Sequence, residues 1–178
     1  MSLPIVKLPT ASLRERSKEV DRDFLCLPET QAFIDAMIPT MYDDDGIGLA
    51  APQVARNIRV CVIGKEADKS LTDDLVLVNP VWIKNSSKTH TDYEGCLSVP
   101  GTFGKVKRYT DIHVDAWDRR GRPLSFEARK FFARVVQHEV DHLDGILFID
   151  KATDIFEQTP EERAEYKKKR GSDARKSI

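Results

Sequence analysis

The sequence is poor in cysteine and contains no long apolar run. Its three cysteines, Cys26, Cys61 and Cys96, are too sparse and too odd in number for a disulfide scaffold, which favours a reducing compartment. No apolar stretch approaches the roughly 18 residues that cross a membrane, and residues 1–9 lack the basic-then-apolar order of a secretory signal. We therefore expect a cytoplasmic protein without a membrane segment.

The sequence also lacks an excess of either charge. Lys and Arg total 28 against 29 for Asp and Glu, so a net charge of −1 gives the whole molecule no attraction to nucleic acid or anionic lipid. We expect no specific DNA partner. The length of 178 residues and the hydrophobic content of 40% suit one packed core, so residues 1–178 are predicted to form a single domain.

Hydrophobic spacing predicts two helices in the body of the chain and a set of short strands. The first helix is expected over residues 28–45, with Pro39 kinking or interrupting it and the run 43–46 ending it. Strands are expected at residues 58–63, 75–78, 81–84, 112–117 and 123–127, with a hairpin turn at 118–122. A capped C-terminal helix is expected over residues 159–170, and the basic residues 171–178 are expected to fray.

The second helix, expected over residues 130–144, has an unusual pattern. Its apolar side is formed by two neighbouring stripes, one with Phe131, Val135, His138 and His142, the other with Phe132, Val136, Glu139 and Leu143. The opposite face is expected to be polar and solvated, with Lys130, Arg134, Gln137, Asp141 and Asp144. Two histidines and a glutamate on the core side of a helix are costly unless they serve a purpose.

Residues 138–142 read H-E-x-x-H. Side chains four apart on a helix are separated by about 40° around its axis, so both imidazoles can reach one metal ion. Glu139 lies beside them, badly placed for a ligand but within reach of a metal-bound water, as a general base must be. The alternative is a chance match among packed or surface residues. Two of the chain's four histidines fall on this stripe, which favours the metal site.

A catalytic metal site needs a third protein ligand and an open position. Downstream of the helix the candidates are only carboxylates, at Asp144, Asp150 and Asp154. Upstream, Cys96 lies in the run Glu94-Gly95-Cys96-Leu97-Ser98-Val99-Pro100, where glycine and proline suggest a tight, exposed turn. Its alternative is a small buried hydrophobe, the interpretation we apply to Cys26 and Cys61. A thiolate ligand suits Fe(II), Ni(II), Co(II) or Zn(II), and spacing does not choose among them.

A third segment, residues 46–54, reads Gly-Ile-Gly-Leu-Ala-Ala-Pro-Gln-Val. Its small residues allow a close backbone approach, and Gln53 supplies an amide donor just beyond a proline-fixed bend. Taken alone, this segment is only a tight loop that enters a strand.

Together the three segments resemble the peptide deformylase family. Residues 46–54 resemble its G-x-G-x-A-A-x-Q signature, residues 94–98 its E-G-C-x-S signature and residues 137–142 its Q-H-E-x-D-H signature, in the family's order. The resemblance covers roughly residues 5–150. It implies an α+β fold in which antiparallel β-sheets wrap around the central histidine helix, and a hydrolase that removes the formyl group from the N-terminal formyl-methionine of new polypeptides.

The resemblance also implies roles for individual residues. Cys96, His138 and His142 would be the metal ligands, with Fe(II) favoured, and Glu139 would be the general base and acid for a metal-bound hydroxide. The oxyanion would be stabilised by Gln53 and the backbone N–H of Leu97. Three positions would bind the substrate: Gly48 through a backbone hydrogen bond, and Ile47 and Val135 as walls of the methionine pocket.

Some positions depart from the family pattern or extend it. Phe103 stands where many bacterial members carry an arginine near the peptide-binding rim, and Pro39 is unusual in its helix. Arg108 matches a position expected to pair with Glu94; its alternative is an ordinary surface arginine.

Two other functions fit parts of the pattern. A zincin-type metallopeptidase shares H-E-x-x-H but takes its third ligand downstream. A structural metal module would need a fourth protein ligand from His90, His113 or Cys61. The basic residues Lys167–Arg170, Arg175 and Lys176 have the charge to contact ribosomal RNA, although a solvated C-terminus is the simpler expectation.

Overall fold

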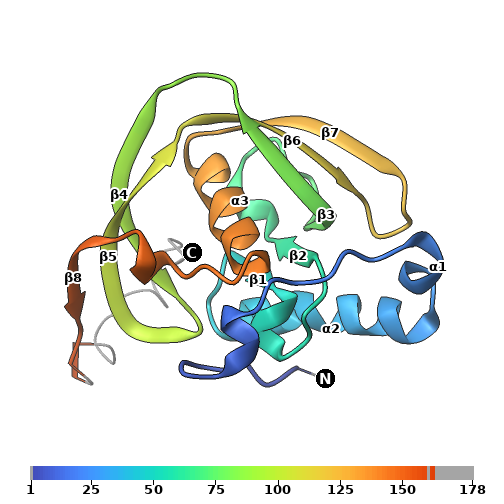
Figure 1. Ribbon diagram of the computed structural model, residues 1–178, viewed down its shortest axis with the longest axis horizontal. Coiled ribbons are helices and arrows are strands. Elements are labelled where there is room, and N and C mark those ends of the chain that lie inside the picture. The colour runs from blue at the N-terminus through green and yellow to red at the C-terminus, as the bar shows by residue number, and fades with distance from the viewer. Residues whose placement is uncertain (1, 160, 163–178) are drawn as a thin grey trace.

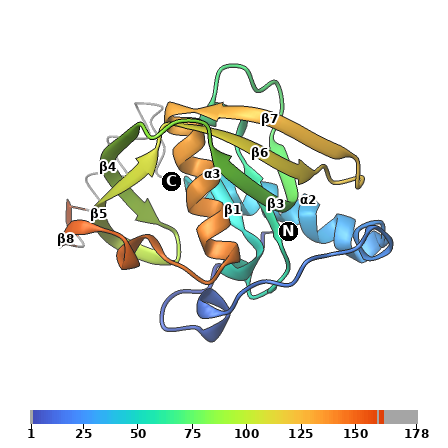
Figure 2. The same cartoon turned by 45° about the horizontal axis from the view of Figure 1, so that its top comes forward.

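The computed structural model describes residues 2–159, 161 and 162. Its helix α3 (Lys130–Leu143) lies at the centre, and two antiparallel sheets curve around it (Figure 1). This arrangement confirms the expected α+β fold. The view in Figure 2 shows the same helix enclosed between the strands of both sheets.

The larger sheet has five antiparallel strands in the order β1-β2-β3-β6-β7. Their bounds are β1 Gly48–Ala50, β2 Val60–Ile63, β3 Leu75–Lys84, β6 Asp111–Trp117 and β7 Pro123–Arg129. The smaller sheet has the order β4-β5-β8, with β4 Thr89–Cys96, β5 Val99–Tyr109 and β8 Thr153–Glu157. The second long helix is α2 Pro28–Asp43, and the short helices are α1 Arg22–Leu25, η1 Ala11–Arg14, η2 Ala51–Val54, η3 Lys65–Ala67 and η4 Phe148–Asp150.

Strand β2 shows how the sequence divides the interior into two cores. All four of its residues are buried. Cys61 and Ile63 join the core that packs against α3, whereas Val60 and Val62 join the core that packs against α2. Because alternate side chains of a strand point to opposite faces, a continuous apolar run fits a strand covered on both sides. Strand β2 therefore separates the two cores, with one face toward helix α3 and the other toward helix α2.

The expected elements are confirmed where hydrophobic spacing was clear. Helix α2 ends at Asp43, as expected, but it continues through Pro39 without interruption. The hairpin turn between β6 and β7 forms, with the Asp118 N–H donating to Arg122 O at 2.8 Å. The capped start at Thr159 also forms, since Thr159 N–H donates to Glu162 and Glu162 N–H donates to the Thr159 hydroxyl. The rest of that predicted helix, and the tail, lie outside the described residues.

Three expectations about local structure were wrong. The two strands predicted at 75–78 and 81–84 are one strand, β3, whose register shifts between Val78 and Val81. The polar face of α3 is not solvated: Arg134, Gln137 and Asp141 are buried, because the sheets surround the helix and supply partners for these groups. Phe131, expected in the core, is 41% exposed.

Strands β4 and β5 were missed because they carry threonine, glycine and charged residues instead of an apolar alternation. Their ladder pairs Thr89 with Tyr109 and continues to Cys96 and Val99. Within the described residues, no helix is long and apolar enough to cross a lipid bilayer.

The C-terminal end of α3 depends on a glycine. Gly145 has φ +74°, and a Cβ there would lie 2.7 Å from the backbone oxygen of Arg14. We predict that Gly145→Ala lowers the free energy of unfolding by more than about 1 kcal/mol, because alanine disfavours this conformation and the backbone of Arg14 leaves it no room. Urea unfolding in the presence of a chelator measures the change.

The matched control is Gly121→Ala. Gly121 has a similar φ of +73°, but its nearest neighbour is the flexible side chain of Arg22, 3.1 Å from the added Cβ. Equal losses of stability in the two variants would contradict the steric part of the argument.

Candidate metal centre

Two imidazoles face the same side of the central helix. His138 and His142 are one turn apart on α3, and their ring centroids are 4.9 Å from each other. Both are almost fully buried, at 2% and 1% exposure. Because α3 is enclosed by both sheets, a polar group on it has to find a partner inside the protein.

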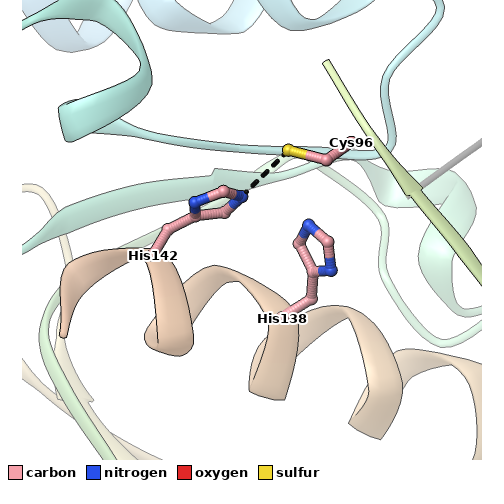
Figure 3. Close-up of side chains that lie close together, drawn as sticks. All are labelled: Cys96, His138 and His142. Atoms are coloured by element: carbon pink, nitrogen blue, oxygen red, sulfur yellow. Dashed lines mark hydrogen bonds between the residues drawn. The ribbon is translucent and has the colours of Figure 1, made fainter. Parts of the chain in front are cut away.

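A thiol approaches these rings from the smaller sheet. Cys96 is the last residue of β4, and its Sγ lies 3.2 Å from His142 Nε2 (Figure 3). The ligand atoms of Cys96, His138 and His142 all lie within 4.8 Å of one another, and in the described part of the chain no other group of three His, Cys, Asp or Glu side chains converges in this way. The expectation of an exposed turn was wrong for Cys96: it is only 7% exposed, and the turn starts at Leu97.

A buried carboxylate orients one of the imidazoles. Glu94 Oε2 lies 2.9 Å from His138 Nδ1, so the other ring nitrogen is left to face the cluster. Arg108 donates to both oxygens of Glu94 at 2.9 Å, which confirms the expected pair, and Arg134 NH1 donates to Oε1 at 2.7 Å. Although burial alone would raise it, these hydrogen bonds with Arg108 and His138 hold the pKa of Glu94 far below its usual value. Histidines that bind metals commonly have such a carboxylate behind them.

Glu139 lies beside the three candidate ligands without joining them. It is 1% exposed, and its Oε2 has no hydrogen-bond partner among the described residues. Burial, and then the negative charge of Glu94, raise its pKa well above the usual value. The backbone of Gly48 packs directly on this carboxyl group, since a Cβ at Gly48 would lie 2.7 Å from Glu139 Cδ. The absence of a side chain at Gly48 therefore leaves room for the carboxyl group of Glu139.

The amide of Gln53 completes the wall next to the thiol. Its Oε1 accepts from Ala50 N–H at 2.8 Å, and its Nε2 lies 3.5 Å from Cys96 Sγ and 3.3 Å from Ser98 Oγ. Leu97 follows Cys96 in the turn between β4 and β5. Sequence reasoning did not single out Ser98, although it belongs to the same short motif as Cys96.

The remaining predicted residues lie on β1, directly before it, or on α3. Gly48 is in β1, the strand at one edge of the larger sheet. Ile47 and Val135 are buried in the same apolar cluster, at 1% and 0% exposure. The predicted site residues thus lie on or directly beside β1, η2, β4 and α3.

The donor set fits a divalent cation. One sulfur and two nitrogens is a common combination for Zn(II) and related ions, and a catalytic site of this kind has three protein ligands. Burial lowers the pKa of His142 well below its usual value, which keeps the ring neutral, and its Nδ1 has no partner among the described residues. Burial raises the pKa of the Cys96 thiol to about 12. A cation bound there would therefore displace a proton from sulfur.

Comparisons with known proteins agree on one family. The family model described as Polypeptide deformylase matches residues 2–157. A peptide deformylase of Pelotomaculum thermopropionicum is 44% identical over 158 residues, which cover 89% of this chain and 96% of that protein.

Solved structures agree with the sequence comparison. The class I type b peptide deformylase of Acinetobacter baumannii with Met-Ala-Ser bound has a TM-score of 0.79 and 34% identity, over 85% of this chain and 98% of that one. The peptide deformylase of Thermotoga maritima has a TM-score of 0.77 and 34% identity, over 86% of this chain and 99% of that one.

The raised pKa of Cys96 predicts a pH dependence of metal binding. Because the pKa of the Cys96 thiol is raised to about 12, binding of a cation near neutral pH has to release the thiol proton. Metal affinity should therefore rise about tenfold per pH unit from pH 7 to 9. Competition with a chelator of known pH dependence measures this slope.

Two cysteine variants serve as test and control. Cys96→Ala should bind metal more weakly and lose the slope. Cys61→Ala removes a thiol that is also buried, in β2, and should keep both the affinity and the slope. A slope that survives in Cys96→Ala would show that the released proton comes from another group.

Proposed function

The chain belongs to the polypeptide deformylase family of metal-dependent hydrolases, and from this membership we propose that it removes the formyl group from the N-terminal formyl-methionine of newly made polypeptides. The observation that carries the proposal is the convergence of Cys96, His138 and His142 next to the buried carboxyl of Glu139. The products would be formate and a peptide with a free N-terminal amine.

The metal would be held by Cys96, His138 and His142. A divalent cation at this position would supply Lewis acidity and lower the pKa of water in the site. Fe(II) is the ion that the family resemblance favours, and Zn(II), Ni(II) and Co(II) suit the same ligands. With iron the site would be sensitive to oxygen, since the thiolate of Cys96 is open to oxidation.

Glu139 would carry the proton. It would take a proton from the water that attacks the formyl carbon, and it would return this proton to the methionine nitrogen when the C–N bond breaks. Its burial, and the lack of a hydrogen-bond partner for Oε2 in the part of the chain that the structure describes, suit a group that exchanges a proton instead of making a permanent ion pair. Because its pKa is raised, positive charge in the site would be needed for Glu139 to act as a base.

Two amide groups would stabilise the negative oxygen of the tetrahedral intermediate. Gln53 Nε2 makes a long hydrogen bond of 3.3 Å to Ser98 Oγ and a contact of 3.5 Å to Cys96 Sγ, so the N–H that faces Ser98 could turn to the substrate at little cost. The second donor would be the backbone N–H of Leu97. Removing one donor of this type commonly raises the barrier by about 3–4 kcal/mol.

The substrate would bind along the edge of the larger sheet. Strand β1 lies at the edge of this sheet, and the backbone of Gly48 would hydrogen-bond an extended peptide there. Ile47 and Val135 would line the pocket of the methionine side chain. A substrate that begins with methionine suits the family, since the Acinetobacter baumannii relative has Met-Ala-Ser bound. We further propose that the protein acts in the cytoplasm. Transient contact of the basic C-terminus with the ribosome stays the less favoured of the two expectations for that segment.

A zincin-type peptidase remains the alternative that shares the H-E-x-x-H motif. The downstream carboxylates expected to compete as third ligand are engaged elsewhere: Asp144 pairs with Arg59 at 2.6 Å, Asp150 with Arg14 at 2.5 Å and Asp154 with Lys105 at 2.9 Å. A structural metal module would need a further protein ligand. His113, one candidate, is paired with Glu127 at 2.8 Å.

Paired substrates test the activity. We predict that the metal-loaded protein releases formate from a formyl-Met-Ala-Ser peptide and leaves the acetylated peptide and internal peptide bonds intact. Glu139→Gln should keep its metal and lose at least about a hundredfold in kcat/KM, because general acid–base groups contribute about 10²–10⁴-fold. Cleavage of an internal bond, or full activity in Glu139→Gln, would contradict the proposal.

A further inference from the structure

Arg134 is a buried guanidinium that the proposed reaction does not use. Its side chain is 5% exposed, and it lies on α3 one turn before His138. Burying a charge of this type is costly unless several hydrogen bonds compensate for it. The sequence pattern had placed it on a solvated face of the helix, so its partners indicate what it does.

The partners of Arg134 all belong to the hairpin formed by β4 and β5. NH1 donates to Glu94 Oε1 at 2.7 Å and to the backbone oxygen of Val106 at 2.9 Å. NH2 donates to the backbone oxygen of His90 at 2.7 Å. One planar guanidinium on the helix therefore holds a side chain and a backbone oxygen of β4 and a backbone oxygen of β5.

These contacts join the two elements that carry the candidate ligands. Cys96 is on β4, two residues after Glu94, whereas His138 and His142 are on α3. A change in the spacing between strand and helix would change the distance between the sulfur and the two nitrogens. Geometry of this kind has to be held to fractions of an ångström for metal binding.

Arg108 does not supply the same connection. Arg108 bonds both oxygens of Glu94, whereas Arg134 bonds Oε1. However, Arg108 lies on β5, in the same hairpin as Glu94. Its tie to α3 is through NH1 to Asp141 Oδ2 at 2.5 Å, and this carboxylate also accepts from Lys151 at 2.7 Å. Among the described residues of α3, His138 and Arg134 both bond the Glu94 carboxylate directly, and Arg134 also bonds the backbone of β4.

We propose that Arg134 is a positioning residue that sets the separation between the strand carrying Cys96 and the helix carrying His138 and His142, and that steadies Glu94 behind His138. This inference rests on the proposed metal site. It assigns to Arg134 an effect on metal affinity and ligand geometry beyond its contribution to folding.

The test uses Arg134→Met, which removes the donors and keeps most of the volume. Side-chain volume matters because Arg134 and Arg108 line a surface cleft of about 600 Å³. A much smaller side chain at position 134 would let water pass from this cleft to Glu94. The measurements are made without substrate: Co(II) affinity by chelator competition, the Co(II) absorption spectrum with its thiolate band, and stability in urea.

Arg134→Met should have a Co(II) affinity at least about tenfold lower, as expected when a residue that supports a metal ligand is removed. The thiolate band in its Co(II) absorption spectrum should shift. Arg134→Lys keeps the charge but cannot hold all three partners at once, so it should recover part of the affinity. If Arg134→Met does not fold, Arg134→Lys carries the same comparison with a smaller loss.

The matched control is Arg59→Met. Arg59 also has a side chain 5% exposed and bonds at the other end of α3, to Asp144 at 2.6 Å, without touching Glu94. It should lose stability and keep its Co(II) affinity within about twofold, because it stands behind no ligand. Equal losses of affinity in the two methionine variants, or an unchanged spectrum and affinity in Arg134→Met, would overturn the positioning role. Failure of the unaltered protein to bind Co(II) through a thiolate would instead overturn the proposed metal site.

Discussion

The candidate metal centre depends on one buried carboxylate. Glu94 has no exposed side-chain surface, and it accepts hydrogen bonds from Arg108, Arg134 and His138. These partners come from the β4–β5 hairpin and from helix α3, so one ionised group fixes a histidine and joins two elements. Buried ion pairs of this kind contribute little net stability, because desolvation offsets the attraction, but they penalise any other arrangement of the same groups.

The same enclosure gives the remaining groups their chemical character. Every residue of helix α3 from Phe132 to Leu143 is buried, and burial lowers the pKa of His142 and raises the pKa values of Cys96 and Glu139. Gly48 lets the edge strand β1 touch Glu139 directly. A site that would bind a cation and move a proton, next to a strand at the edge of its sheet, suits the hydrolysis of an amide at the end of an extended peptide.

The sequence predicted this region better than it predicted the rest of the fold. The spacing of His138 and His142 places both side chains on the same side of a helix, whatever the position of that helix in the fold. The three short motifs identified the family. Strands β4 and β5 could not be predicted from a two-residue period, because their outer face is solvated and their inner face carries Glu94 and Arg108. The burial of Arg134 could not be predicted either, since only the tertiary fold brings β4 and β5 over that face of the helix. The ligand roles themselves stay predictions.

X-ray absorption of the Zn(II)-loaded protein tests the central claim most directly. One sulfur at about 2.3 Å and two imidazole nitrogens at about 2.0–2.1 Å, with one further light atom from solvent, are expected for three protein ligands and an open position. A first shell without sulfur, or one filled by four protein ligands, would contradict the account.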